Sequence, residues 1–245
     1  IPAMVAQGYD AGFSSALSAI SGSLGTVIPP SITFIIYGMI TGESIGDLFL
    51  SGIIPGLIFG FMLCIMVFIK SKKNGWKGET QRASLKEIGR LFLDTIWGLL
   101  SPVIVLGGIY SGLFTPTEAA AVAVVYSLIV GIFIYKELRL AELKETLFST
   151  AKTTGMILLI IMNAGIFSWV LTQQGIAASL TEMALALTDN KYIMLVIINI
   201  VFLCAGCVMD NTSALYILVP IIMPIAKALD INMIQLGVIL VLNLS

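Results

Sequence analysis

The stretch GTVIPPS, residues 25–31, lies in the middle of a run without charged residues from 11 to 42. Adjacent prolines remove two backbone hydrogen-bond donors, and each disfavours the helical conformation in the residue before it. The run is long enough to cross a membrane, but it cannot form one intact helix. Non-helical backbone at membrane depth survives only where it is buried in protein or lines a wet cavity. The stretch therefore predicts two half-helices with an unwound centre, an arrangement that transporters use to bind ions and substrates.

The composition of the chain is that of a membrane protein. Of its 245 residues, 58% are hydrophobic and 11% are charged, whereas soluble domains carry roughly 25% charged residues. At about 20 apolar residues for each crossing, the chain has material for six or seven spans. This excludes a soluble enzyme, a disordered chain and a nucleic-acid binder, and the net charge of −1 indicates no polyanionic partner. The sequence predicts an all-α integral membrane protein.

Charge-free stretches mark the predicted spans, and basic loops indicate their direction. The stretches are residues 11–42, 48–69, 95–117, 119–135, 153–181, 192–209, 211–226 and 231–245. Two loops, 70–90 and 136–152, hold 11 of the 13 Lys and Arg residues. The positive-inside rule places both loops in the cytoplasm. The two crossings predicted between the loops agree with that placement.

A second interruption lies at residues 210–213, between two long apolar runs. Either these residues form a loop in water, or they form the tip of a re-entrant helical hairpin spanning about 191–229. Lys191 and Lys227 can both lie on the outer side only if the segment enters the membrane and returns, which favours the hairpin. Asp210 is then a carboxylate inside the membrane. Such a group is functional by default, and its expected partner is a cation.

Three amphipathic stretches are predicted to lie along the membrane surface. Residues 84–97 and 138–148 place leucines and aromatic residues at helical spacing beside Lys and Arg, which is typical of helices at the cytoplasmic interface. The alternative for these two stretches is a pair of solvated linkers. A further stretch, 176–187, is expected on the outer side.

The turn at residues 115–118 is predicted to face outward and to begin a helix. Either Thr115 or Thr117 can cap that helix, with Pro116 near its first turn. Glu118 would be favoured there by the helix dipole. The alternative role for Glu118 is that of an ion ligand.

A weak internal repeat relates the two ends of the chain. At an offset of 222 residues, Ile1-Pro2 corresponds to Met223-Pro224 and Ala6 to Ala228. Both stretches contain a proline, an amphipathic turn, a short polar break and an apolar helix with a serine at its end. Repeats of this kind are the sequence trace of inverted-topology transporters.

The chain resembles the large membrane subunit of tripartite ATP-independent periplasmic (TRAP) transporters over essentially all of its length. The resemblance is carried by GSLGTVIPPS with IIYGMITGESIGDLFLSGIIPG, by LSPVIVLGGIYSGLFTPTEAAAVAVVYSLIVG, and by AKTTGMILLI with VMDNTSALYILVPIIMPIAKALDI. It implies an elevator-type transporter built from two inverted repeats, each with a re-entrant hairpin and a broken helix.

The resemblance also implies a function and partners. The function is sodium-driven uptake of small organic acids, such as C4-dicarboxylates or sialic acids, across the bacterial inner membrane. A periplasmic binding protein delivers the substrate, and a small four-helix membrane subunit braces the scaffold. Sodium ions couple the transport, and no other cofactor is implied.

The resemblance assigns site residues by position. Ser21, Ser23, Gly25, Thr26, Pro29 and Pro30 belong to a first ion and substrate region. Asp210, Asn211, Thr212, Ser213, Asn243 and Ser245 belong to a second, with Asp210 as a sodium ligand. Sodium favours oxygen ligands, which hydroxyls, carboxylates and freed backbone carbonyls supply. Half-helix N-termini and hydroxyl groups would hold an anionic substrate, because these motifs contain no Lys or Arg.

Three regions are expected along the chain. Residues 1–69 comprise the end of the first hairpin, the first broken helix and the following span. Residues 70–152 comprise the surface helices and two scaffold spans. Residues 153–245 comprise a span, the second hairpin and the start of the second broken helix. The chain is expected to be an internal piece of a longer polypeptide, with a second Pro-Pro motif beyond its last residue.

Two other functions compete with this reading. One is a channel, or another ion-coupled transporter of the inverted-repeat type, that needs no binding protein. The other is an intramembrane enzyme that uses Asp210, which would require a second carboxylate or an activated serine beside it. The expectation from the sequence is a transporter and not an enzyme.

Overall fold

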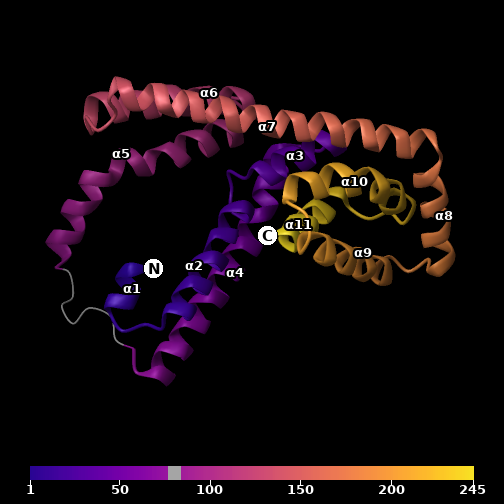
Figure 1. Ribbon diagram of the computed structural model, residues 1–245, viewed down its shortest axis with the longest axis horizontal. Helices are drawn as coiled ribbons and strands as arrows, with labels where there is room; N and C mark the ends of the chain where they lie inside the picture. Colours follow the sequence, from indigo (N-terminus) through magenta and orange to yellow (C-terminus); the bar gives the residue numbers. More distant parts are fainter. Residues whose placement is uncertain (77–83) are drawn as a thin grey trace. The chain divides into compact units, whose positions relative to one another are not determined.

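The computed structural model describes residues 1–76 and 84–245, apart from the side chains of residues 140 and 141. Within these ranges every regular element is a helix (Figure 1). Residues 77–83, in the middle of the predicted basic loop 70–90, lie outside the described residues. The chain divides into two compact units: unit 1 comprises Ile1–Gly25 and Ile54–Leu140, and unit 2 comprises Thr26–Ile53 and Ala141–Ser245.

Six segments of the described chain are long and apolar enough to cross a membrane. They are Ala11–Thr41, Ile45–Asn74, Leu85–Tyr110, Pro116–Ile134, Glu142–Gln173 and Asn211–Ala228. At a rise of about 1.5 Å per residue, an 18-residue helix is about 27 Å long, close to the thickness of the hydrocarbon core. The prediction of an all-α, multi-pass membrane protein is confirmed.

Unit 1 contains the surface-loop helices and an antiparallel helix pair. Its elements are α1 (Pro2–Ala6), most of α2 (Ala11–Val27), most of α4 (Ile45–Asn74), α5 (Leu85–Tyr110), α6 (Pro116–Ile129) and the π-helix η1 (Val130–Ile134). Helices α5 and α6 pack against each other. The turn between them is tight because the Phe114 ring fills the space beside Gly108, where a Cβ atom would lie 2.3 Å from the ring.

The stretches 84–97 and 138–148 form helices, but not separate ones. Helix α5 begins at Leu85, after the side chain of Ser84 accepts a hydrogen bond from the Lys86 amide, and it continues without a break into the apolar span. Residue 140 likewise begins α7 (Leu140–Gln173). An amphipathic pattern shows which face of a helix meets water, but it does not mark where the helix ends. The predicted stretch 176–187, in contrast, coincides with α8 (Ile176–Leu187).

Unit 2 is built around one central helix. Its elements are α3 (Ile32–Thr41), α7, α8, α9 (Lys191–Gly206), α10 (Asn211–Ala228) and α11 (Met233–Leu244). Helix α10 packs against α3, α8, α9 and α11, and α11 packs against α3 and α9 (Figure 1). Fully buried side chains from these helices, and Phe49 from the first part of α4, which also belongs to unit 2, form the core: Phe34, Tyr37, Phe49, Phe202, Leu215, Val219, Leu236 and Leu240.

Helices α3 and α11 approach each other closely at one glycine. A Cβ atom on Gly237 would lie 2.5 Å from the Tyr37 ring and 3.0 Å from the Leu48 side chain. The Tyr37 hydroxyl donates a hydrogen bond of 2.6 Å to the carbonyl of Met233, in the first turn of α11. Tyr37 thus fixes the start of α11 against α3.

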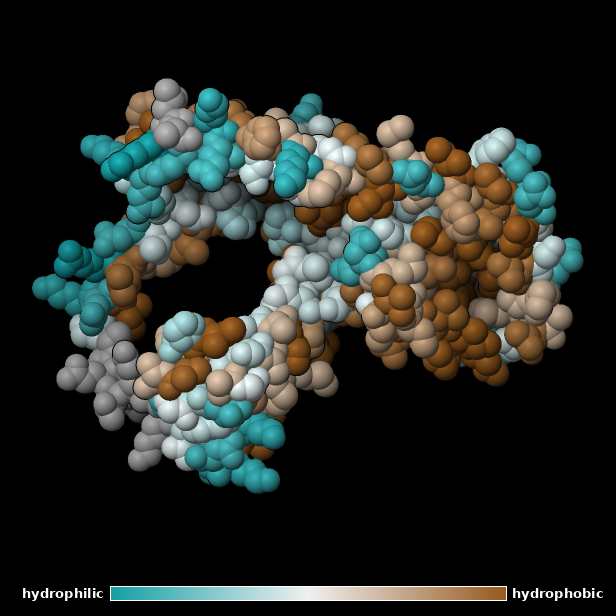
Figure 2. Space-filling model, viewed as in Figure 1, coloured by the Kyte–Doolittle hydropathy of each residue, from teal (hydrophilic) through white to brown (hydrophobic). Residues whose placement is uncertain are grey.

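The described surface is largely hydrophobic, as a membrane protein requires. Helix α9 exposes a row of apolar residues at helical spacing: Ile193, Val196, Ile200 and Leu203. Figure 2 shows hydrophobic residues over the part of unit 2 formed by α8, α9 and α10. In a soluble protein such a surface would cause aggregation, whereas lipid or packed protein covers it without cost.

Local backbone structure supports the internal repeat at an offset of 222 residues. In both copies a helix ends, one residue adopts a left-handed conformation, and a side chain then caps the next helix. The corresponding pairs are Ala6 and Ala228 at the helix ends, Gly8 (φ 85°) and Asp230 (φ 51°), and the caps Asp10 and Asn232. A positive φ is uncommon outside glycine. The same sequence of backbone states in both copies therefore supports a structural repeat.

Candidate functional site

The predicted helix break at the twin prolines is confirmed. Helix α2 ends at Val27 and α3 begins at Ile32. Because Pro30 has no N–H group, the carbonyl of Thr26 loses its helical partner. The hydroxyl of Ser31 replaces that partner by donating to the Thr26 carbonyl, and its oxygen also accepts from the Phe34 amide. Ser31 is fully buried, so it ends one helix and caps the next.

Thr26 and Ser245 come together in unit 2 although 219 residues separate them. Their hydroxyl oxygens lie 2.5 Å apart. The hydroxyl of Ser245 also lies 2.6 Å from the carbonyl of Val241, one turn earlier in the chain. Residues assigned to the first and second predicted regions thus meet at a cluster of oxygen atoms. Of the other first-region residues in this unit, Pro29 is buried and Pro30 is exposed.

The predicted interruption at Asp210 is present as the connection between α9 and α10. Asp210 is the N-cap of α10: one carboxylate oxygen accepts from the amides of Thr212 (3.0 Å) and Ser213 (3.1 Å). The other accepts from the Ser213 hydroxyl at 2.6 Å. Asn211, Thr212 and Ser213 form the first turn of α10 and are half-buried. The oxygen that accepts from the Ser213 hydroxyl retains one lone pair for a further partner.

The end of α11 lies against α9, and we call this contact the α9–α11 seam. It comprises Asn199, Gly206, Asn243 and Leu244. The side-chain amide of Asn243 donates a hydrogen bond of 2.6 Å to the side-chain oxygen of Asn199. Near the end of α9, a Cβ atom on Gly206 would lie 3.1 Å from the carbonyl oxygen of Asn243. The seam therefore places Gly206, which shortly precedes Asp210 in the chain, next to Asn243, a predicted site residue.

Ser21, Ser23 and Gly25 belong to unit 1, where they lie on α2. Ser21 lines an apolar groove of about 510 Å³ between α2 and α4, together with residues such as Leu24 and Phe68. Ser23 is half-buried and Gly25 is exposed. The assignment of these three residues to a site stays a prediction.

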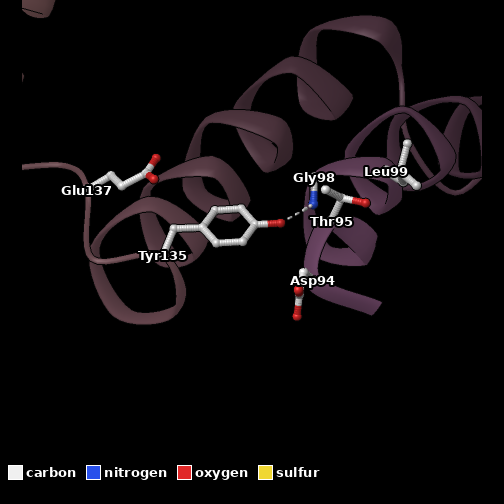
Figure 3. Close-up of a pocket in the computed structure, with 6 residues that line it drawn as sticks. All are labelled: Asp94, Thr95, Gly98, Leu99, Tyr135 and Glu137. Atoms are coloured by element: carbon white, nitrogen blue, oxygen red, sulfur yellow. Dashed lines mark hydrogen bonds between the residues drawn. The ribbon is translucent and has the colours of Figure 1, made fainter. Parts of the chain in front are cut away.

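A second pocket of unit 1 joins α5 to the end of η1 (Figure 3). It has a volume of about 400 Å³ and is lined by Asp94, Thr95, Gly98, Leu99, Tyr135 and Glu137. The Tyr135 hydroxyl accepts a hydrogen bond of 3.2 Å from the Gly98 amide. At the residue before Gly98, the Tyr126 hydroxyl donates to the carbonyl of Trp97 at 2.6 Å. Both tyrosines bind backbone groups, so the pocket is a junction between helices.

The turn before α6 shows the capping role considered for Glu118. Thr115, and not Thr117, is the N-cap of α6, and Pro116 is the first residue of the helix. The Thr115 side chain accepts from the Glu118 amide, while the Glu118 carboxylate accepts from the Thr115 amide and hydroxyl at 2.8 Å. This reciprocal capping box explains Glu118 without an ion.

We expect Glu118→Gln to leave transport and its ion dependence unchanged. A glutamine side chain completes the same capping box, because its oxygen accepts from the Thr115 amide. An ion ligand, in contrast, would need the charge. Uptake measured against sodium concentration checks this. A marked loss of ion dependence in Glu118→Gln would assign the carboxylate to an ion site.

Three residues that make contacts at the helix break or in the α9–α11 seam were not predicted from the sequence: Ser31, Asn199 and Gly206. Ser31 follows the prolines directly, and the loss of the Pro30 donor could have indicated that a neighbouring hydroxyl would serve the freed carbonyl. Asn199 and Gly206 lie in an apolar run with no signal of a long-range partner. Only the fold reveals their contacts with Asn243.

The fold and these sites define a class of protein: a multi-pass helical membrane protein with one helix broken at twin prolines and a helix pair joined at a polar tip. Comparison with known proteins agrees. The family model described as the tripartite ATP-independent periplasmic transporter, DctM component, matches residues 1–245. The chain belongs to this family.

Several curated relatives are similar over the whole chain. The C4-dicarboxylate TRAP transporter large permease protein DctM of Pseudomonas aeruginosa is 41% identical over 245 residues, which cover 57% of that protein. The isethionate TRAP transporter permease protein DctMQ of Oleidesulfovibrio alaskensis is 40% identical, with 39% of its length covered. The sialic acid TRAP transporter large permease protein SiaM of Vibrio cholerae is 37% identical over 96% of the chain and 55% of its own length. The chain thus spans between about two fifths and three fifths of these relatives.

Proposed function

We propose that the chain forms part of a permease that takes up small organic acids across the bacterial inner membrane, driven by sodium. The observation that carries the proposal is the contact between the Thr26 and Ser245 hydroxyls at the break between α2 and α3, on the same end of α11 as Asn243, which lies against α9 just before Asp210. These groups present hydroxyl and amide oxygens, which suit a hard cation.

The substrate class follows from the relatives and from the charge of the motifs. Proteins similar to this chain are named for C4-dicarboxylate, sialic acid and isethionate, all of which are small organic acids. Residues 21–31 and 210–213 contain no Lys or Arg. In this proposal the amides at the N-terminus of α3 hold the acid, because a helix N-terminus favours anions and the Thr212 and Ser213 amides of α10 are bound to Asp210.

The partners and the orientation are parts of the same proposal. A periplasmic binding protein delivers the acid, and a small four-helix membrane subunit braces the permease. The loops 70–90 and 136–152 face the cytoplasm because they hold most of the basic residues. Helices α9 and α10 then form a re-entrant hairpin that enters from the periplasmic side. Transport proceeds by an elevator motion, in which the core moves against a scaffold that includes residues 84–150.

Uptake in proteoliposomes tests the proposal. The complete permease, with its small subunit, is reconstituted and supplied with radiolabelled succinate or sialic acid. We expect uptake only when an inward sodium gradient and the binding protein are both present, and no uptake when potassium replaces sodium. Uptake without the binding protein would favour the channel or the other transporter class. Conversion of the acid without its accumulation would favour the intramembrane enzyme.

A further inference from the structure

Asn199 makes two hydrogen bonds that fix the orientation of its side chain. It lies in the middle of α9 and is half-buried. Its side-chain NH₂ group donates to the carbonyl of Leu195 in its own helix at 2.9 Å. With the nitrogen held there, the side-chain oxygen faces α11 and accepts from Asn243.

The bond from Asn199 determines how the Asn243 amide is turned. The NH₂ group of Asn243 has two hydrogens. One is donated to Asn199 at 2.6 Å and the other to the carbonyl of Ile239 at 2.9 Å. Both donors of Asn243 are therefore used, and its side-chain oxygen is left as an acceptor. In the described parts of the chain, no residue donates a hydrogen bond to that oxygen.

We propose that Asn199 is a positioning residue that presents the side-chain oxygen of Asn243 to the coupling cation. This inference rests on the proposed function, since it assigns a cation to the region of Asn243. Without the acceptor of Asn199, one hydrogen of the Asn243 amide loses its partner. The amide is then free to rotate and to turn its NH₂ group toward the place where the cation would bind, which repels the cation.

The seam does not depend on this bond for its packing. Gly206 brings α9 within contact of Asn243 and Leu244 near its C-terminal end, and Phe202 and Ile198 of α9 are buried in the same unit. Loss of the amide bond is therefore expected to change the orientation of Asn243 more than the position of α11. This separates a positioning role from a purely structural one.

The test compares variants of the complete permease in proteoliposomes with the binding protein. Asn199→Leu removes the acceptor, and Asn199→Asp retains an acceptor for the Asn243 amide. Asn163→Leu is the matched control, because Asn163 also donates to a carbonyl one turn earlier, that of Leu159 at 2.7 Å, but is exposed on α7. Uptake of succinate is measured against sodium concentration.

We expect Asn199→Leu to raise the sodium concentration for half-maximal uptake about tenfold, with the maximal rate at saturating sodium changed less than about threefold. Asn199→Asp and Asn163→Leu should stay within about threefold of the parent protein. In an Asn243→Leu background, Asn199→Leu should have no further effect. Asn199→Ala serves as a second variant if the leucine prevents insertion, and the same shift is expected.

Three results would overturn the inference. A fall in maximal rate with an unchanged sodium requirement would make Asn199 structural. An equal shift in Asn163→Leu would make the effect nonspecific. Sodium-independent uptake by the parent protein would overturn the proposed function as well as this inference. That result is measured before any variant is tested, so the two failures can be told apart.

Discussion

Asp210→Asn is expected to reduce the proposed sodium-driven uptake about 100-fold or more while α10 keeps its cap. Asparagine caps a helix as well as aspartate does, because its side-chain oxygen accepts from the same amides. The substitution therefore preserves the contacts to the Thr212 and Ser213 amides and removes the charge together with the acceptor for the Ser213 hydroxyl. Removing one member of a charge pair inside a membrane protein costs about 3–5 kcal/mol, which corresponds to two or more orders of magnitude.

Two further variants separate the charge from the cap. Asp210→Ser caps α10 without a charge and should lose uptake to the same degree. Asp210→Ala loses both, and should also lower the melting temperature of the purified protein. All three should insert into the membrane, as measured by their amount in detergent extracts. Normal sodium-coupled uptake by Asp210→Asn would show that the carboxylate serves only as a cap.

Gly237→Val is expected to prevent unit 2 from folding. A Cβ atom at this position would overlap the Tyr37 ring, at 2.5 Å. That ring cannot move aside because it is fully buried and its hydroxyl is bound to the Met233 carbonyl. Overpacking of a core typically costs about 1–3 kcal/mol and occasionally more, and valine adds three carbon atoms where a single one already overlaps the ring. We expect little monodisperse protein in size-exclusion chromatography.

Gly165→Val is the matched control for this substitution. Gly165 lies inside α7, is exposed, and has open space where a Cβ atom would be placed. Both substitutions put a β-branched residue within a helix, so their helix propensities change equally. Gly165→Val should therefore give near-normal amounts of folded protein. An equal loss in both variants would assign the effect to the helix backbone and not to the contact with Tyr37.

The sequence was sufficient to predict features that depend on neighbouring residues. The twin prolines predicted the break between α2 and α3, because the loss of two donors is a property of the residues themselves. The capping box at Thr115 and Glu118 follows from a spacing of three residues. The bounds of α8 were also predicted, since Gly175 precedes it and a polar stretch follows.

Features that depend on distant residues could not be predicted. The amide of Asn163 bonds only its own helix, whereas that of Asn199, in an equally apolar sequence, bonds α11. Nothing local distinguishes the two residues. The continuity of α5 and α7 was missed for a different reason, because the change from an amphipathic to an apolar pattern was read as a boundary, although α5 continues through Gly98 and Pro102. The division into transport-core and scaffold regions stays a prediction.

The buried hydroxyl of Ser31 has a consequence for the energetics of ligand capture. A chain broken by two prolines would ordinarily sample many conformations, and a ligand would have to select one of them at an entropic cost. Here a single side chain links the end of α2 to the start of α3. The gap between the half-helices is thus preorganised. If it binds the proposed coupling ion, free energy that would otherwise go into ordering the gap would remain to discriminate between ions of different radius.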